Sequence, residues 1–597
     1  MNLTPEQKAI GKQNFNAAMG SKLLRRDFLR KGIEQNLASG KGLGPYYFGY
    51  DKTIKERLRV GVLGTGDEGS VLMGAINPDF IEVLAIADIR PYNQYRAFHG
   101  DYYSDTANKV RCGLMKKYGW KTEDEARKNV KVYGPYQDLI KDAKSLKLEA
   151  VIIALPLHLH APAAIAAMRA GLHVLTEKLM GHSVAECKEM ARVAEDGKDE
   201  KGNKLHLATG HQRHYNILYN NAVEAIAKGV IGDLHYIRAQ WHRGNMPGTD
   251  SWQQPLPKEA KPNDALSEKL IKELASWEKK VKELKAAKKP NPKEIQLWEN
   301  KVAQKKKQIE DKVIADKAKQ FGYTDKKIGS GKDIYDRPAI EELIRWRLWN
   351  RTGGGLMAEL GSHQLDASSI FISAMHGGEK QYPLNVAASS GRLIFGNDRD
   401  VDDHVYCLYE YAAPGYDPKD PNNDRKKISV QYASINGNGF GGYGETVFGT
   451  NGTLLLEREQ DAMLYKTSAV DDPAKVVANK DKATNKKYPV TITTSENGKP
   501  IKPDEISAAI GTQAFGTDIS RGYTEEIEHW AWCIRNPDPK NLPKCHPKVA
   551  LADAVIALTT NIAAREGRRI EFKKEWFDPK SDETPEGKKP DVKRYKS

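Results

Sequence analysis

The run Arg59–Gly69, RVGVLGTGDEG, limits the possible folds of this chain more than any other stretch. Its first half predicts a buried parallel strand that ends at Leu63, and Gly64, Gly66 and Gly69 then supply the pattern G-x-G-x-x-G. The first glycine permits a tight turn, the second lets a pyrophosphate approach the backbone, and the third lets the following helix pack closely. The helix N-terminus faces the phosphates with free N–H groups. We therefore predict a dinucleotide-binding turn; the alternative is an empty Rossmann fold.

A second predicted strand, Ile81–Ala87, supports the first interpretation. It ends at Asp88, which lies 19 residues after Gly69. A dinucleotide fold places there the carboxylate that binds the ribose hydroxyls of adenosine. Asp88 favours NAD because it would repel a ribose phosphate. Arg90 lies two residues further on and offsets that repulsion, so NADP stays an alternative.

Strands and helices alternate through residues 58–215, which predicts a doubly wound parallel sheet, a Rossmann domain. Further buried strands are expected at Ala150–Leu155, His173–Thr176 and His206–Gly210. Past about residue 230, alternating apolar strands are separated by Gly, Asn and Asp turns, and helices return near the end. We predict an α/β fold class, with residues 216–575 forming a second α/β domain around an open, mostly antiparallel sheet.

Three segments lie outside this two-domain plan. Residues 1–57 are expected to form an N-terminal arm, and residues 576–597 a polar, lysine-rich, flexible tail. Within 264–320, apolar residues recur at three-to-four spacing on both sides of a Pro-Asn-Pro break, which predicts an antiparallel coiled-coil hairpin. This hairpin is either a docking arm for a partner or an insertion without a function of its own.

The charge of the chain is uneven. Of the net charge of +14, the segment 258–333 contributes +8, with 21 Lys against 13 Asp and Glu. The lysines alternate with glutamates at helical spacing and no aromatic side chains line a basic face, so we expect no nucleic-acid interface.

The five cysteines form no C-x-x-C pair, which predicts neither a disulfide framework nor a metal site. No run of about 18 apolar residues occurs, so no membrane span is expected. Arg25-Arg26 resembles a twin-arginine export signal. A polar stretch follows it instead of an apolar one. We therefore expect a cytoplasmic protein, with periplasmic export as the alternative.

Two further motifs carry a family resemblance. The segment ALPLHLHAPAAIAAMRAGLHVLTEKLM contains Glu177-Lys178, and Gly353–Asp366 is GGGLMAELGSHQLD. Both resemble the motifs of the Gfo/Idh/MocA oxidoreductases, in the same order, and the resemblance covers residues 58–575 apart from the hairpin and two loops. It implies an active site between the two domains and an open sheet that joins subunits into a homo-oligomer, a dimer or a tetramer. It also implies oxidation or reduction of a carbon of a sugar, inositol or related polyol.

The chemistry of hydride transfer gives these motif residues roles. His363 titrates in the right range to take the hydroxyl proton. Lys178 would stabilise a developing alkoxide beside the nicotinamide. Glu359 lies one helical turn before His363, on the same face, where it would orient the imidazole or bind a substrate hydroxyl. Asp366 would support the site from i+3. The family has a proline where this chain has Leu179, and an aspartate where this chain has Glu359. The resemblance therefore leaves the orientation of the Lys178 side chain and the size of the substrate undetermined.

The predicted site falls into three groups. The catalytic residues are Lys178, His363 and Glu359. The cofactor-binding residues are Gly64, Gly66, Asp67, Glu68, Gly69, Asp88, Ile89, Arg90, Leu155, Pro156, His160, Glu177 and Lys178. The substrate-binding residues are Lys178, Arg213, Trp241, His242, Glu359, His363 and Asp366. No metal is expected.

Three functions compete for this chain. The first is an NAD(P)-dependent dehydrogenase that acts on a CH–OH group of a sugar or cyclic polyol. The second is an NAD-dependent glycosidase, which oxidises the sugar transiently and returns the hydride after the glycosidic bond is cleaved. The third is a non-catalytic Rossmann scaffold that acts through its hairpin and basic arm. The intact run E-x-G-x-H-x-x-D favours the dehydrogenase.

Overall fold

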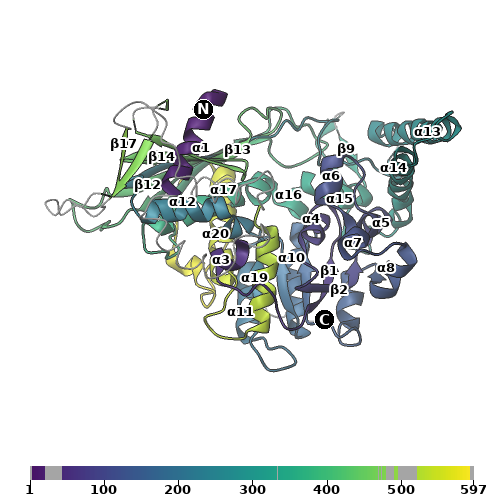
Figure 1. Ribbon diagram of the computed structural model, residues 1–597, viewed down its shortest axis with the longest axis horizontal. Helices are drawn as coiled ribbons and strands as arrows, with labels where there is room; N and C mark the ends of the chain where they lie inside the picture. Colours follow the sequence, from purple (N-terminus) through teal and green to yellow (C-terminus); the bar gives the residue numbers. More distant parts are fainter. Residues whose placement is uncertain are drawn as a thin grey trace.

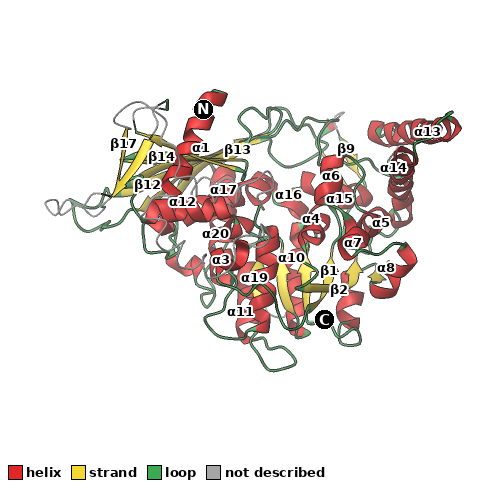
Figure 2. Ribbon diagram, viewed as in Figure 1, coloured by secondary structure: helices red, strands yellow, loops and turns green. Residues whose placement is uncertain are grey.

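Two β-sheets organise the molecule, and Figure 2 shows their strands as two separate yellow groups. The computed structural model describes residues 3–19, 43–261, 263–331, 334–467, 470–471, 474–478, 490–494 and 521–591. One sheet has six strands, all between residues 58 and 209, and the other has eight strands between residues 234 and 571. The predicted α/β fold, with a parallel sheet followed by a mostly antiparallel one, is confirmed.

The six-stranded sheet is parallel throughout, with the strand order β3-β2-β1-β4-β5-β6. Its strands are β1 (Leu58–Leu63), β2 (Ile81–Ala87), β3 (Lys131–Tyr133), β4 (Ala150–Ile153), β5 (His173–Thr176) and β6 (Leu207–Thr209). Its main helices are α4 (Asp67–Ala75), α5 (Pro91–His99), α9 (Tyr136–Asp142), α10 (His160–Arg169) and α11 (Val184–Asp196). β4 and β5 are buried along their whole length, as expected when helices cover both faces. The order reverses between β1 and β4, which places a ligand crevice at their carboxyl ends.

The turn from β1 into α4 needs its glycines. Gly64 has φ of +87°, in the region that favours glycine. A Cβ on Gly69 would lie 2.1 Å from the carbonyl oxygen of Gly64, so no other residue fits there without moving the backbone. Gly66 is the N-cap of α4, and no side chain caps this helix end. The turn therefore has the backbone geometry that its G-x-G-x-x-G pattern predicts.

The eight-stranded sheet has the order β15-β14-β13-β7-β12-β11-β10-β18, and only the β7–β12 pair is parallel. Its strands are β7 (Leu234–Trp241), β10 (Pro383–Gly391), β11 (His404–Ala412), β12 (Lys427–Ile435), β13 (Tyr443–Gly449), β14 (Gly452–Glu457), β15 (Asp461–Lys466) and β18 (Ile570–Glu571). Inward residues of β11 and β12 are buried in alternation, and α12 (Ile217–Ala227), α17 (Ser362–Ala374) and α20 (Pro547–Glu566) contribute to the same core. On β11, Tyr406 and Leu408 point the other way and are 48% and 49% exposed.

Smaller elements complete the chain between and around the two sheets. They are α3 (Leu43–Phe48), α6 (Asp105–Val110), α7 (Gly113–Tyr118), α8 (Glu123–Asn129), α15 (Ala339–Ile344), α16 (Asn350–Gly353), α19 (Tyr523–Arg535), and the strand pairs β8 (Lys326–Ile328) with β9 (Tyr335–Arg337) and β16 (Ala474–Ala478) with β17 (Val490–Thr494). In α20, length and composition alone would allow a membrane span, but most of its apolar window is buried inside the protein.

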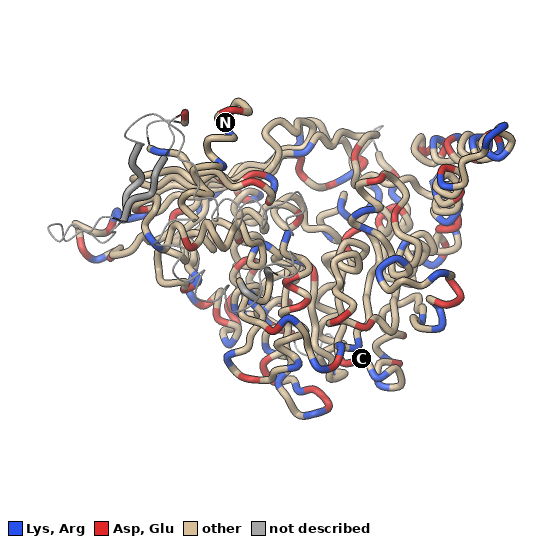
Figure 3. Tube along the Cα trace, in the orientation of Figure 1, with Lys and Arg blue, Asp and Glu red and all other residues tan. Residues whose placement is uncertain are grey.

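Helices α13 (Ala265–Ala286) and α14 (Pro292–Glu310) project from the body beside the Rossmann domain (Figure 1). They run antiparallel, because the ion pairs Lys285–Glu299 and Lys305–Glu273 join opposite ends of the two helices. Figure 3 shows basic and acidic residues interspersed along both helices. Mixed charges of this kind are typical of a solvent-exposed helix pair.

Both ends of the chain pack on the body. Helix α1 (Pro5–Met19) lies against β15, where Lys8 pairs with Glu457 and Asn14 donates to the carbonyl of Leu464. Arg25 and Arg26 lie outside the described residues. Composition predicts a flexible tail from residue 576, whereas residues 576–591 lie along α11. Lys188 Nζ donates there to the backbone carbonyls of Glu575, Ser581 and Glu583, and composition does not reveal hydrogen bonds of this kind.

Candidate active site

A cavity of about 220 Å³ opens at the carboxyl ends of β1, β4 and β5, facing the second domain. The Rossmann domain contributes the G-x-G-x-x-G turn, the loop after β4 and the Glu177-Lys178 segment after β5. The second domain contributes the Gly353–His363 motif, the end of β7 and the start of α19. The residues that line the cavity are Gly66, Asp67, Glu68, Ala154, Leu155, Leu157, His160, Glu177, Lys178, Leu179, Gln212, Trp241, Arg243, Trp346, Arg347, Gly353, Ala358, Glu359, Leu360, His363, Tyr443, Glu459, Arg521 and Tyr523.

Lys178 spans the gap between the two domains. Its Nζ donates to the backbone carbonyls of Glu359, at 2.5 Å, and Ala358, at 3.3 Å. These carbonyls belong to a π-helical turn, Met357–Gly361, that precedes α17. The Lys178–Leu179 peptide bond is cis. The ammonium thus lies in the cavity beside the second motif, as the resemblance implies.

His363 is the second residue of α17 and lies in the same cavity wall. Its ring lies 5.4 Å from the ring of Trp241, and its Nδ1 is buried without a hydrogen-bond partner among the described residues. Burial, with the nearby charges of Lys178 and Arg213, holds the pKa of His363 well below its usual value. The imidazole is therefore neutral near pH 7, which is the form that accepts a proton.

Glu359 has a different partner from the one its spacing predicts. Its Oε1 accepts from Nε of Arg347 at 2.9 Å. Burial opposes ionisation, but Arg347, with Lys178 and Arg243, lowers the pKa of Glu359 to about 2. The carboxylate is therefore ionised. It pairs with an arginine, and the backbone carbonyl of Glu359 accepts a hydrogen bond from Lys178. The i+4 argument assumes an α-helix, and the π-helical turn changes that register.

Two more carboxyl groups line the Rossmann side of the cavity. Burial and the neighbouring Glu68 raise the pKa of Glu177 to about 8. Its Oε2 accepts from the backbone N–H of Lys178 at 3.0 Å, while its Oε1 and Glu68 Oε1 are buried and have no described partner. At neutral pH, Glu177 is mainly protonated and so offers an O–H donor to a ligand in the cavity.

The predicted ribose carboxylate is tightly held. Asp88 accepts from the backbone N–H of Thr65 at 2.8 Å, the backbone N–H of Arg90 at 2.9 Å and the amide of Asn93 at 3.1 Å. These bonds fix Asp88 beside the G-x-G-x-x-G turn, where a ribose would lie. Around Gly66 there is room, since a Cβ there would meet only Asn93 Nδ2 at 3.7 Å. The turn and Asp88 together fit an adenine dinucleotide.

The hairpin segment ends on this part of the Rossmann domain. Asp311, just after α14, accepts from Nε of Arg90 at 2.8 Å and from the backbone N–H of Tyr92 at 3.1 Å. Gln254 Oε1 accepts from Nη1 of Arg90 at 3.1 Å. Ile89 packs against a separate apolar cluster that includes Ile314 at the end of the hairpin segment and Leu343 beyond it. The end of the hairpin segment and the residues after it therefore pack against the residues that follow β2.

The other predicted residues divide between the cavity wall and the layer behind it. Leu155 and His160 line the cavity. The two ring nitrogens of His160 each lie 2.8 Å from a backbone carbonyl, one of Leu155 and one of Leu179. His160 therefore connects the loop after β4 with the loop after β5. Pro156 follows Leu155 in the first of these loops. Trp241 lines the cavity, stacked on Tyr443 at 4.4 Å. The lining residues do not include Arg213, His242 or Asp366.

Arg213 and Asp366 lie behind the wall. Arg213 has no exposed surface and binds Glu459, Glu445 and Gln364. Asp366 accepts from His214 at 2.8 Å.

Sequence reasoning missed several lining residues. Arg521 and Tyr523 are examples, and only their position at the cavity reveals them. Arg347 is different, because it lies in the run RWRLWN just before the second motif. Its closeness to that motif in the sequence could have indicated a place in the site.

Comparison with known proteins gives the class of this domain. Residues 58–206 match the family model described as "Oxidoreductase family, NAD-binding Rossmann fold", GFO_IDH_MocA. The first domain is therefore an NAD-binding Rossmann domain of an oxidoreductase family. The sequence motifs predict this same family, Gfo/Idh/MocA, and the match to its model covers residues 58–206 of the chain.

Curated relatives match about a third of the chain. It is 28% identical over 188 residues to a glycosyl hydrolase family 109 protein of Stenotrophomonas maltophilia, covering 31% of this chain and 35% of that protein. It is 30% identical over 192 residues to inositol 2-dehydrogenase of Rubrobacter xylanophilus, covering 32% of this chain and 44% of that enzyme. The matches thus span less than half the length of these relatives.

Solved structures resemble the chain over most of its length at low identity. A levoglucosan dehydrogenase in complex with NADH and L-sorbose is 14% identical, covers 87% of this chain and 99% of its own, and has a TM-score of 0.47. An oxidoreductase domain protein from Kribbella flavida is 14% identical, covers 87% of this chain and 100% of its own, and has a TM-score of 0.49.

Proposed function

We propose that this chain is an NAD-dependent oxidoreductase that removes a hydride from a CH–OH carbon of a sugar or cyclic polyol. One observation carries the proposal: the ammonium of Lys178 and the neutral imidazole of His363 line one cavity at the carboxyl ends of the parallel sheet. An NAD-binding domain supplies one of these groups and a separate domain the other.

The two groups suit the oxidation of an alcohol. Bound NAD supplies the hydride acceptor. His363 takes the hydroxyl proton at a ring nitrogen, and the Lys178 ammonium stabilises the negative charge that develops on the oxygen. Trp241 offers an apolar face for the C–H side of a sugar ring, while Arg243 and the Arg347–Glu359 pair offer hydrogen bonds to its hydroxyls.

The test is reduction of added NAD by a panel of free sugars, inositols and sugar acids. We expect absorbance of reduced nicotinamide to grow with at least one of them. A protein that cannot be loaded with NAD or NADP in a fluorescence titration would refute the proposal and support a scaffold instead. NAD binding without reduction by any compound of the panel would also count against it.

A glycosidase that uses NAD transiently is the second candidate. Two observations favour it: the match to a glycosyl hydrolase family 109 protein, and the end of the hairpin segment, which binds Arg90 and packs against Ile89. A cofactor that is regenerated in place has no need to exchange. Release of p-nitrophenol from p-nitrophenyl glycosides, without accumulation of NADH, would select this candidate over the dehydrogenase.

We also infer a homo-oligomer built on the open sheet. The outer face of β11 exposes Tyr406 and Leu408, and Tyr236 and Phe448 stack on neighbouring strands. Large apolar and aromatic side chains on one sheet face are typical of subunit contacts.

Arg90 bears on the choice between NAD and NADP. Because Asp311 neutralises its guanidinium, we expect wild-type protein to prefer NAD, and Asp311→Asn to shift the ratio of NADPH to NADH affinity toward NADPH by about tenfold. Fluorescence titration of both reduced cofactors measures the ratio. Asp316→Asn, at an exposed position five residues further on, is the control that should leave it unchanged. An unchanged ratio in Asp311→Asn would contradict this role of Arg90.

The pH profile of the oxidation should have two limbs. Because the pKa of His363 is lowered, the base form persists as the pH falls, and the acid limb should lie below pH 6.5. Ionisation of Glu177, with a pKa of about 8, adds a negative charge beside the developing alkoxide, so kcat should fall above about pH 8. Glu177→Gln should remove the basic limb and keep the acid one. A basic limb that survives this substitution would refute the assignment.

A further inference from the structure

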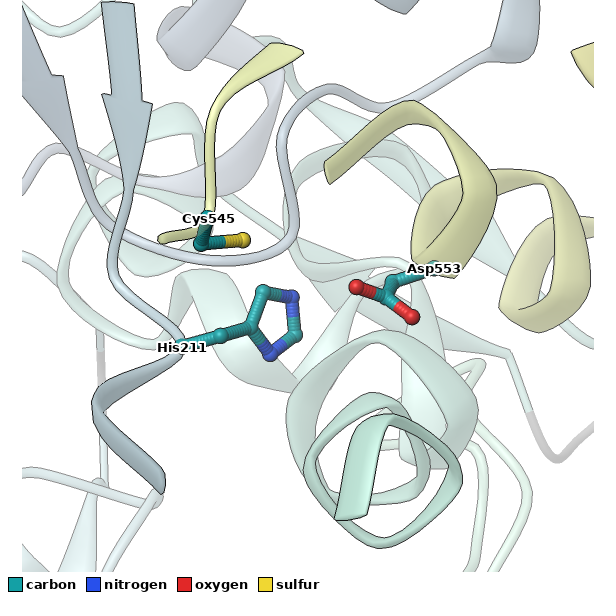
Figure 4. Close-up of side chains that lie close together, drawn as sticks. All are labelled: His211, Cys545 and Asp553. Atoms are coloured by element: carbon teal, nitrogen blue, oxygen red, sulfur yellow. The ribbon is translucent and has the colours of Figure 1, made fainter. Parts of the chain in front are cut away.

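A second group of chemically reactive side chains lies behind the cavity wall. His211 follows β6, Cys545 precedes α20, and Asp553 lies in α20. The imidazole nitrogen, thiol sulfur and carboxylate oxygen that they offer all lie within 4.8 Å of one another. Figure 4 shows the three side chains directed into the space between them. Each is 1% exposed or less, so the group is closed to solvent.

Asp366 and His214 extend this group. His214, Asp366 and Asp553 form a second set of ligand atoms within 4.8 Å of one another, and Asp553 belongs to both sets. Asp366 Oδ2 also lies 3.7 Å from Nδ1 of His211. The backbone holds the parts together, because the N–H of Thr209 in β6 donates to the carbonyl of Cys545 at 3.1 Å.

Several polar atoms of this group lack partners. Both ring nitrogens of His211 are buried and make no hydrogen bond within the part of the chain that the structure describes. Oδ2 of Asp366 and Oδ2 of Asp553 also lack a donor group there, and the hydrogen bond between the two carboxyl groups requires one of them to hold a proton. A buried polar atom without a partner costs about 1–3 kcal/mol. Such a cluster is unusual in a native core, and it indicates a bound group that would satisfy the carboxylate oxygens and one ring nitrogen of His211.

The donor set selects the kind of group. Imidazole, thiolate and carboxylate together suit a zinc-type divalent ion, whereas calcium and magnesium take oxygen ligands. Lys380 Nζ lies 2.6 Å from Oδ1 of Asp553 and 3.6 Å from Oδ1 of Asp366, so it contacts one oxygen of each carboxylate. Two carboxylates, one thiolate and one ammonium sum to a charge of −2, which one divalent cation balances.

We propose that His211, Cys545, Asp553 and Asp366 bind one zinc-type divalent metal ion in a closed, structural site. Zinc bonds of about 2.0–2.3 Å in a tetrahedron require the ligand atoms of His211, Cys545 and Asp553 to draw together by about 1 Å from a separation of up to 4.8 Å. Rotations of the four side chains supply that movement. No open coordination position reaches the cavity, since none of His211, Cys545 and Asp553 lines it.

The metal ion would fix the position of α17, the helix that carries His363. Asp366 lies three residues after His363 on α17, and the rings of His211 and His363 are 6.0 Å apart. One ion would therefore join the loop after β6, α17 and α20 directly behind His363. Its ligands are positioning residues, and metal binding is independent of which substrate the cavity takes.

The test uses the full-length protein, freed of metal with a chelator and then titrated with cobalt(II) chloride. We expect one Co²⁺ per chain, with the near-ultraviolet charge-transfer band of a thiolate ligand, and displacement of Co²⁺ by zinc chloride. Cys545→Ser should lose the band and weaken Co²⁺ binding by more than about 100-fold. Cys187→Ser, which alters an equally buried cysteine outside the group, should behave as wild type.

Wild-type protein alone also decides the proposal, in case Cys545→Ser does not fold. X-ray absorption of the zinc-loaded wild type should show one sulfur and three nitrogen or oxygen ligands, and zinc should raise Tm relative to chelator. A wild type that binds no Co²⁺, or that binds it with nitrogen and oxygen ligands only, would overturn the site. In that case a proton shared between Asp366 and Asp553 explains the group.

Discussion

Lys178→Met should lower kcat by about 100- to 1,000-fold, the range seen when one donor to a developing oxyanion is removed. The ammonium lies in the cavity, where its Nζ meets the carbonyls of Ala358 and Glu359, and methionine keeps the length of the side chain without the charge. The affinity for NADH should change little, because the G-x-G-x-x-G turn and Asp88 are untouched. Stopped-flow absorbance of the first turnover measures the step directly, and fluorescence titration measures cofactor binding.

Lys204→Met is the matched control for this experiment. Lys204 pairs with Glu195 at the surface of the same domain and is 57% exposed, so its loss should leave both kcat and cofactor affinity unchanged. Full first-turnover activity in Lys178→Met would remove the role proposed for the ammonium. A large loss of NADH affinity with an unchanged rate of hydride transfer would make Lys178 a cofactor ligand only.

The Rossmann half could be predicted closely because its signals are local. The backbone requires glycine at position 64 because φ is positive there, and at position 69 because a Cβ would contact the carbonyl oxygen of Gly64. The glycine pattern of the sequence indicates both positions directly. Asp88 follows from a fixed distance along one βαβ unit. The partner of Arg90 on the hairpin segment could not be predicted in this way. Arg90 and Asp311 are 221 residues apart, and no periodicity links an ion pair across such a distance.

The candidate site shows the same division. Lys178 and His363 could be placed because each belongs to a motif of several residues. The partner of Glu359 could not, because residue spacing on an assumed α-helix does not anticipate the π-helical turn Met357–Gly361. His211 and Cys545 share no spacing pattern that a metal motif would show, so sequence reasoning predicted no metal. Their proximity depends on how α20 packs beside β6.

Arg213→Met should destabilise the protein by about 3–5 kcal/mol, because it leaves two buried carboxyl groups without their cation. Arg213 has no exposed surface; its Nε donates to Glu459 at 2.9 Å and its Nη1 lies 3.3 Å from Glu445. The sequence placed Arg213 among substrate-binding residues, and its position behind the wall gives it a structural role instead. Urea unfolding followed by circular dichroism should therefore show a lower midpoint. Arg565→Met, at an exposed position on α20, should change the free energy of unfolding by less than about 1 kcal/mol.

A second substitution separates lost charge from lost packing at Arg213. Burial already raises the pKa of Glu445 to about 7, so a neutral side chain there is tolerated when the cation is absent. Arg213→Met combined with Glu445→Gln should therefore recover part of the stability that Arg213→Met loses, because one uncompensated buried charge is removed. No recovery would mean that packing, or Glu459 alone, accounts for the loss. If Arg213→Met instead unfolds like wild type and only raises KM for the substrate, the guanidinium reaches the cavity during turnover and the structural role is wrong.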